Sequence, residues 1–206
     1  MAEKETGRIE AFSDAVFAVA ITLLVLDLHV PALDKLPPGG LTHALLALWP
    51  TVGACIVSFV TILIVWLNHH RLFEQITRKD HTLQILNGLL LMLVTLIPFP
   101  TALVAEYVQT PYAKVALAVY CGLTFLMALA YNLLWNHASR DGRLLADDHD
   151  RHRVQHITAQ YRLGPLLYAV TFALAFVNAI ACCAAIASLA VLFALPDRTP
   201  KPTVTG

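Results

Sequence analysis

The sequence contains few charged residues. Asp, Glu, Lys and Arg make up 14% of its 206 residues, whereas they make up about 25% of an ordinary soluble domain. Hydrophobic residues account for 58% of the chain. Because so little charge cannot cover the surface of a water-soluble globule, the composition predicts an integral membrane protein.

Several features of soluble chemistry are also missing. The formal net charge is zero and there is no extended basic patch, which argues against nucleic-acid binding. The chain has no glycine-rich phosphate loop and no nucleophile elbow. The four cysteines lie in apolar stretches without Cys-x-x-Cys spacing, so we interpret them as packing residues rather than as disulfides or zinc ligands: Cys55, Cys121, Cys182 and Cys183.

Long uncharged stretches divide the chain into membrane spans. Residues 36–70, 81–105, 115–139 and 163–196 each exceed the roughly 20 residues that cross a bilayer. The last stretch would be about 51 Å long as one helix, so we expect a tight hairpin near Asn178. An earlier span surrounds the uncharged residues between Asp14 and Asp27.

The sequence therefore predicts an all-α integral membrane fold with six transmembrane helices. We place these helices near 8–30, 43–68, 82–106, 113–137, 158–177 and 179–196. They form a single domain over residues 1–196, and the polar residues 197–206 are expected to be a disordered cytoplasmic tail.

The distribution of basic residues predicts the orientation of these helices. With six spans and the N-terminus inside, only Lys35 and Lys114 fall in outer loops, which follows the positive-inside rule. We therefore expect a multi-pass protein of the cell membrane with both termini in the cytoplasm. The inner segments hold the remaining basic residues: Lys4, Arg8, Arg71, Arg78, Lys79, Arg140, Arg143, Arg151, Arg153, Arg162, Arg198 and Lys201.

The first predicted helix has two different faces. One face carries residues that fall within an arc of about 60° on a helical wheel, namely Val19, Leu23 and Leu26, with Phe12 on the same side. Thr22 lies at the border of this arc, and Asp14 lies about 140° from Val19. Both faces pack against neighbouring helices in the ordinary interpretation. In the alternative, the apolar face lines the axis of an oligomer and narrows it.

Polar partners for Asp14 occur at the end of the second predicted helix. Trp66 precedes His69 and His70 by about one turn, so the indole N–H and an imidazole can satisfy Asp14 and Ser13. Because imidazole titrates near neutrality, we expect a pH-sensitive polar brace. A metal site is disfavoured, since adjacent helical residues point about 100° apart and no third ligand is apparent.

Three motifs together resemble the prokaryotic members of the transmembrane protein 175 potassium channel family. They are Arg8-x-x-x-Phe12-Ser13-Asp14, Trp66-x-x-His69-His70 and Ile97-Pro98-Phe99-Pro100-Thr101. The resemblance covers the whole chain and implies a homotetramer whose first helices line a central pore. It also implies a constriction made by hydrophobic side chains, not a carbonyl filter of the Thr-Val-Gly-Tyr-Gly kind, whose glycine signature the sequence lacks.

The resemblance further implies roles for individual residues. Val19 would form the constriction, Leu23 and Leu26 would follow one and two turns outward, and Thr22 would add a ring of hydroxyls. Other motif residues would form an inter-helix network that holds the first helix: Arg8, Phe12, Ser13, Asp14, Trp66 and His69 or His70. The implied function is a potassium channel, weakly selective over sodium, that is not an enzyme and needs no cofactor. Its partners would be potassium ions, lipid and further copies of the chain.

Other interpretations remain open from the sequence. Asp27 at the outer end of the first helix either attracts cations as a ring of acids or is a solvated helix end. Asp14 with His69 or His70 suits the proton relay of a proton-coupled transporter or proton carrier, although no internal repeat supports a transporter. A membrane-embedded enzyme is favoured by the histidine pair and disfavoured because no further ligand or nucleophile is apparent.

Overall fold

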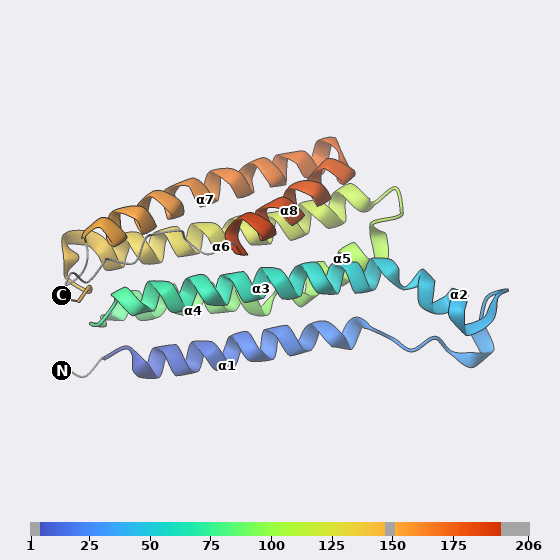
Figure 1. The fold of residues 1–206 in the computed structure, drawn as a ribbon, viewed down its shortest axis with the longest axis horizontal. Helices are drawn as coiled ribbons and strands as arrows, with labels where there is room; N and C mark the ends of the chain where they lie inside the picture. The colour runs from blue at the N-terminus through green and yellow to red at the C-terminus, as the bar shows by residue number, and fades with distance from the viewer. Residues whose placement is uncertain (1–4, 147–150, 195–206) are drawn as a thin grey trace, which may run out of the picture.

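The structure is a computed structural model that describes residues 5–146 and 151–194, and all its elements are helices (Figure 1). The predicted tail at 197–206 lies outside the described residues. The elements are α1 (Gly7–Leu23), η1 (Leu24–Asp27), η2 (Leu33–Lys35), α2 (Gly40–Ala47), α3 (Trp49–Gln75), α4 (His81–Thr95), α5 (Pro98–Tyr107), α6 (Ala113–Ser139), η3 (Arg140–Gly142), α7 (Arg151–Val177) and α8 (Ala179–Ala194). The predicted all-α fold is confirmed.

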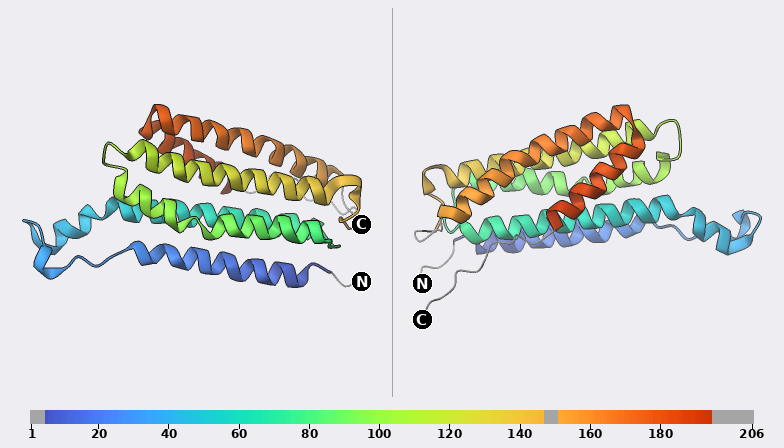
Figure 2. Two further views of the ribbon diagram at one scale, coloured as in Figure 1. Left: turned by 180° about the vertical axis from the view of Figure 1, so that it is seen from behind. Right: turned by 45° about the horizontal axis from the view of Figure 1, so that its top comes forward.

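The long helices lie side by side in one bundle and alternate in direction along the chain (Figures 1 and 2). Helix α1 lies at the edge of the bundle, where it packs against α3 and α4, while α4 packs against α6 and α6 against α7. The start of α1, the α3–α4 connection and the end of α6 share one end of the bundle. Helix α2 projects beyond the opposite end.

Four helical segments within the described ranges are long and apolar enough to cross a membrane. They are Gly7–Asp27, Trp49–Gln75, His81–Tyr107 and Ala113–Gly142. Helices α7 and α8 follow as a hairpin, in which the Asn178 side-chain oxygen accepts hydrogen bonds from the backbone N–H groups of Ile180 (2.9 Å) and Ala181 (3.1 Å). This side chain caps α8, and the predicted hairpin near Asn178 is confirmed.

The second long helix begins and ends later than the predicted range 43–68. Residues Gly40–Ala47 form the separate helix α2, and α3 begins at Trp49 with Pro50 in its first turn. Proline is favoured at this place because its missing N–H has no intrahelical partner there. Helix α3 then continues to Gln75, so both histidines of the motif lie inside it.

The first and third predicted helices also differ in detail. The range 82–106 is divided into α4 and α5 by a break at residues 96–97. Pro98 and Pro100 account for this break, because neither residue donates a backbone hydrogen bond to the preceding turn. The range 8–30 is α-helical only to Leu23 and ends in the 3₁₀ turn Leu24–Asp27.

Helix α7 contains a proline whose missing N–H is compensated from α6. Pro165 cannot donate to the carbonyl of Tyr161, four residues earlier. The side-chain amide of Asn132 on α6 donates to that carbonyl over 2.8 Å instead. This contact joins α6 and α7 where α7 would otherwise be weakest.

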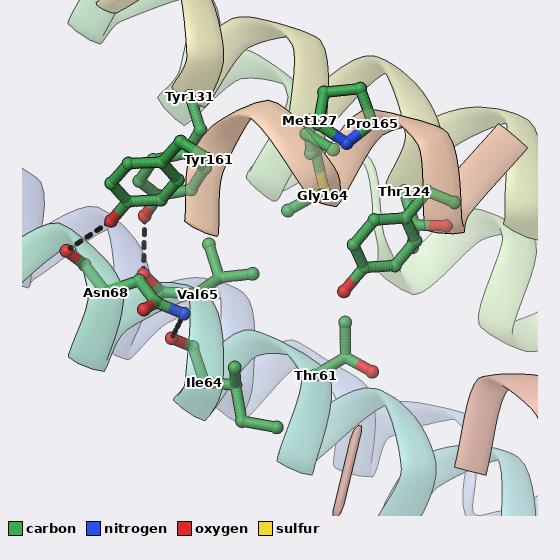
Figure 3. A pocket seen from close by; sticks show the side chains of 12 residues that line it. Thr61, Ile64, Val65, Asn68, Thr124, Met127, Tyr131, Tyr161, Gly164 and Pro165 are labelled. Carbon is green, nitrogen blue, oxygen red and sulfur yellow. Dashed lines mark hydrogen bonds between the residues drawn. The ribbon is translucent and has the colours of Figure 1, made fainter. Parts of the chain in front are cut away.

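A pair of tyrosines joins the same two helices to α3. The rings of Tyr131 and Tyr161 stack with centroids 5.8 Å apart, beside a cavity of about 60 Å³ between α3, α6 and α7 (Figure 3). Both hydroxyls point away from α6 and α7 and donate to backbone carbonyls of α3, at Val65 and Asn68. The aromatic pair therefore holds α3 against the C-terminal half of the bundle.

Replacing Asn132 with alanine is expected to lower the stability of the purified protein by about 1 kcal/mol, because the Tyr161 carbonyl loses its donor. In a Pro165→Ala background the loss should be smaller, since alanine supplies the backbone N–H that proline lacks. Thermal unfolding of the two single variants and the double variant measures this. Strictly additive losses would contradict the compensation.

Candidate functional site

One face of α1 is buried against the bundle. Ser13, Phe17, Ala20 and Leu24 are each at most 1% exposed. They recur every three or four residues, so they form one stripe along the helix, and this stripe faces α3 and α4. The burial explains which way α1 is turned about its own axis.

The opposite face of α1, together with the turn η1 that continues it, is exposed and apolar. Val19 is 56% exposed, Leu23 39% and Leu26 65%, and Phe12 lies on the same side at 64%. We call Val19, Leu23 and Leu26 the apolar stripe. The neighbouring Thr22 is exposed as well, and its hydroxyl donates to the backbone carbonyl of Val19 over 2.8 Å. The Thr22 hydrogen is therefore used within the helix, and only the lone pairs of its oxygen face outward.

A buried chain of hydrogen bonds holds α1 to α3 and α4 together. The Asn87 side-chain amide of α4 donates to the Ser13 hydroxyl over 3.0 Å. The Ser13 hydroxyl donates in turn to the carbonyl of Ile9 over 2.8 Å. On its other side the Asn87 oxygen lies 2.9 Å from Nε2 of His69 on α3. We call Ser13, Asn87 and His69 the buried tie.

The surroundings of His69 fix its orientation and its hydrogen-bonding role. The imidazole is 2% exposed, stacks on Phe73 at 4.4 Å between ring centroids, and meets the edge of Phe17 at 5.4 Å. Because the Asn87 nitrogen donates to Ser13, its oxygen faces His69, so the imidazole carries its proton on Nε2. His69 therefore donates within the buried tie.

A second contact between α1 and α3 lies at the surface of the chain. The indole N–H of Trp66 donates to Oδ1 of Asp14 over 2.8 Å. His70 stacks on Trp66 with centroids 6.1 Å apart, and its Nε2 lies 3.7 Å from a carboxylate oxygen of Glu74. We call Asp14 and Trp66 the exposed tie. It fastens the same turn of α1 as the buried tie but from the other side.

The structure brings most of the predicted network together and corrects its wiring. The expected contact between Asp14 and a histidine is not made by the side chains that the structure describes. Asp14 accepts its hydrogen bond from Trp66 instead, and His69 is linked to Ser13 through Asn87. Histidine contributes to the exposed tie only as the ring of His70 stacked on the indole.

Two further predicted members lie outside both ties, and one member was missed. Arg8 and Phe12 are exposed, and Phe12 shares the side of the apolar stripe. No role in this network was predicted for Asn87, which lies in the uncharged stretch 81–105. The need for such a residue was visible, because Ser13 and His69 each require a hydrogen-bonding partner inside a nonpolar bundle, but only the packing of α4 shows that Asn87 lies at their depth.

The remaining predicted groups have simple surroundings. Asp27 is partly exposed at the end of η1, and its backbone carbonyl lies 3.0 Å from Nδ1 of His29. The thiols of Cys121 and Cys182 are buried and lie 3.4 Å apart between α6 and α8. Across residues 5–146 and 151–194 no group of three or more His, Cys, Asp or Glu side chains is placed to hold a metal ion.

The sequence is similar to those of known proteins. The family model described as endosomal/lysosomal potassium channel TMEM175 matches residues 8–98. A protein of Chamaesiphon minutus named as a potassium channel is 52% identical over 193 residues, which are 94% of this chain and 95% of that protein. A chicken protein named as an endosomal/lysosomal proton channel TMEM175 is 33% identical over 138 residues, which are 64% of this chain and 28% of that protein.

A solved structure agrees with the fold as well. The crystal structure of a lysosomal potassium-selective channel TMEM175 homolog from Chamaesiphon minutus superimposes with a TM-score of 0.85 at 50% identity. The match covers 92% of this chain and 96% of that one. The similarities to the Chamaesiphon minutus protein and structure extend over almost the whole chain and confirm the resemblance carried by the three sequence motifs. The chain belongs to the TMEM175 family.

Proposed function

We propose that this protein is a potassium channel whose ion path runs along the apolar stripe of α1. The observation that carries the proposal is the orientation of α1 about its own axis. This orientation buries Ser13 and Phe17 but leaves Val19 and Leu23 exposed on the side away from the bundle. The names of the bacterial relatives support the choice of ion.

The tetramer follows from this geometry as part of the proposal. A single α1 at the edge of a bundle cannot enclose a path, whereas four copies around an axis can direct four apolar stripes at one another. The resulting rings of Val19 and Leu23 would exclude water and block ions by dewetting as well as by contact. Conduction then requires α1 to tilt or rotate so that the rings widen.

Selectivity is proposed to be weak between potassium and sodium. The sequence lacks the glycine-rich segment that presents carbonyl rings to a dehydrated ion. Thr22, at the border of the stripe, exposes an oxygen whose hydrogen is bonded to the Val19 carbonyl. A ring of Asp27 carboxylates at the outer end would raise the local concentration of cations without distinguishing between them.

The membrane topology completes the proposal. We infer six crossings in the cell membrane, with α7 and α8 added to the four long apolar segments. The end of the bundle that holds the start of α1 and the α3–α4 connection is assigned to the cytoplasm, because the basic residues concentrate in those segments. In this orientation both termini are cytoplasmic. We also propose that the channel works without a cofactor.

A proton pathway is the second candidate, because the chicken relative is named as a proton channel. The two ties do not favour a relay between Asp14 and His69: Asp14 is bonded to an indole and His69 to an amide, neither of which passes on a proton readily. In reconstituted membranes the reversal potential should follow a potassium gradient and ignore an equal proton gradient. A reversal potential that follows the proton gradient would support the second candidate.

Substitution of Val19 or Leu23 by asparagine is expected to raise potassium flux into liposomes by roughly tenfold, because a polar ring wets the constriction. Val25→Asn is the matched control, since Val25 is also 56% exposed on the same segment but points away from the stripe. Unchanged flux at both stripe positions, or an equal rise in the control, would refute the pore assignment.

Substitution of Asn87 by leucine is expected to destabilise the protein by about 1–3 kcal/mol, because the buried Nε2–H of His69 loses its acceptor. Gln84→Leu replaces an exposed amide one turn earlier on α4 and should change stability little. Thermal unfolding compares the two variants.

Asp14→Asn keeps an acceptor for Trp66 and should lower the stability of the protein less than Asn87→Leu does. The reverse order would show that the exposed tie is the stronger one.

A further inference from the structure

The connection between α3 and α4, residues 76–80, is held between two other segments at one end of the bundle. Its Thr77 carbonyl accepts a hydrogen bond from the Glu5 N–H over 3.1 Å. On the other side the N–H groups of Thr77 and Arg78 donate to the Leu144 carbonyl over 3.0 and 3.2 Å. We call residues 76–80 the linker. The linker lies between the start of α1 and the turn that follows α6, and it is hydrogen-bonded to both.

The start of α1 is fixed to the linker by a buried side chain. Thr6 is fully buried, and its hydroxyl lies 3.3 Å from the Ile76 carbonyl and 2.6 Å from a carboxylate oxygen of Glu10. The backbone N–H of Lys79 lies 3.4 Å from the Glu5 carboxylate. A displacement of the linker would therefore move the residues from which α1 begins.

The other end of the linker is anchored by Asp80. This residue caps α4 by accepting from the Leu83 N–H over 2.7 Å. Nε2 of His137, in the last turn of α6, lies 2.8 and 3.1 Å from its two carboxylate oxygens, and the Arg143 guanidinium lies 3.6 Å away. In addition, Arg78 donates to the Arg143 carbonyl over 3.3 Å. Helix α6 and the turn that follows it are therefore bound to the linker by ionic contacts with Asp80 as well as by backbone hydrogen bonds.

The charge of Asp80 persists into acid. Burial raises the pKa of this carboxyl, but the Leu83 N–H, the hydrogen bond and charge of His137 and the charge of Arg143 together outweigh burial and lower it below its ordinary value. A carboxyl whose pKa is lower in the folded protein stabilises the fold above its ordinary pKa and loses that effect only as the pH falls through the lowered value. The ionic contacts of Asp80 with His137 and Arg143 should therefore persist under mildly acidic conditions.

We propose that Asp80, with His137 and Arg143, positions the pore helix from the cytoplasmic end. This proposal rests on the proposed function. Asp80 lies where the linker meets α4, so it acts on α1 by two routes: through the linker to Thr6, and through α4 to Asn87, two turns later, which bonds Ser13. Weaker contacts of Asp80 with His137 and Arg143 would leave the start of α1 less firmly held. Helix α1 would then reach the tilted or rotated orientation needed for conduction more readily.

The proposal is tested first on the resting protein by backbone hydrogen exchange. In Asp80→Asn the exchange of residues 5–10 and of residues 142–146 should become about 5- to 30-fold faster than in the wild type, because asparagine can still cap α4 but carries no charge for His137 and Arg143. Asp80→Glu should restore slow exchange. Glu106→Gln, an exposed change at the far end of α5, is the control and should leave both segments unchanged.

A pH profile separates positioning by charge from general packing. Wild-type protection of residues 5–10 should not decrease as the pH falls from about 7 to about 5, because Asp80 keeps its charge throughout. In Asp80→Asn the protection should be low over the whole range. Faster exchange at residues 142–146 with no change at 5–10 would overturn the proposal, because the linker would then transmit nothing to α1.

Potassium flux into liposomes supplies the second readout. Asp80→Asn should raise the flux at least about threefold over the wild type, and His137→Gln, which keeps a hydrogen-bond donor but not a charge, should raise it less. Faster exchange at both segments with wild-type flux would overturn the coupling to conduction. Absence of potassium flux from the wild type would overturn the proposed function itself, and that outcome is visible before any variant is compared.

Discussion

The hydrogen-bond chain Ser13–Asn87–His69 is the constraint on which the rest of this structure depends. Each of the three side chains is buried in the bundle, away from water, so each must find its hydrogen-bonding partner within the chain. Their mutual bonding fixes α1 against α3 and α4 in depth and in rotation at once. Once this rotation is set, Phe17, Ala20 and Leu24 are buried and the apolar stripe is turned outward.

This division of α1 explains how one helix serves both stability and conduction in the proposed channel. Thr6, Ser13 and Asp14, near its start, lie outside the apolar stripe. They hold the helix, through the buried tie, the exposed tie between Asp14 and Trp66, and the contact of Thr6 with the linker. The stripe of Val19, Leu23 and Leu26 makes no polar contact that would resist rotation, so the energetic control of its position lies in the ties and not in the stripe.

Much of this arrangement was predictable from the sequence, for physical reasons that differ between its parts. Uncharged stretches predict the long helices, and the spacing of Val19, Leu23 and Leu26 predicts their common face. The role of Asn87 was not predictable, because the sequence does not show which of several polar residues share a depth after folding. The break before Pro98 is indicated in the sequence by Pro98 and Pro100, whereas the separation of α2 from α3 depends on local backbone geometry that hydropathy does not show. The contact of Asp80 with His137 joins α4 to the far end of α6, a pairing set only by tertiary packing.

The central claim, that the face of α1 carrying Val19 lines the ion path, is tested most directly by accessibility to thiol reagents. Single cysteines at positions 19, 22 and 25 would be introduced into a chain whose four native cysteines have been replaced by alanine. A small cationic thiol reagent applied in water should block potassium current through the Val19→Cys and Thr22→Cys channels and leave the Val25→Cys channel unaffected. Block at position 25 with no block at positions 19 and 22 would contradict the account.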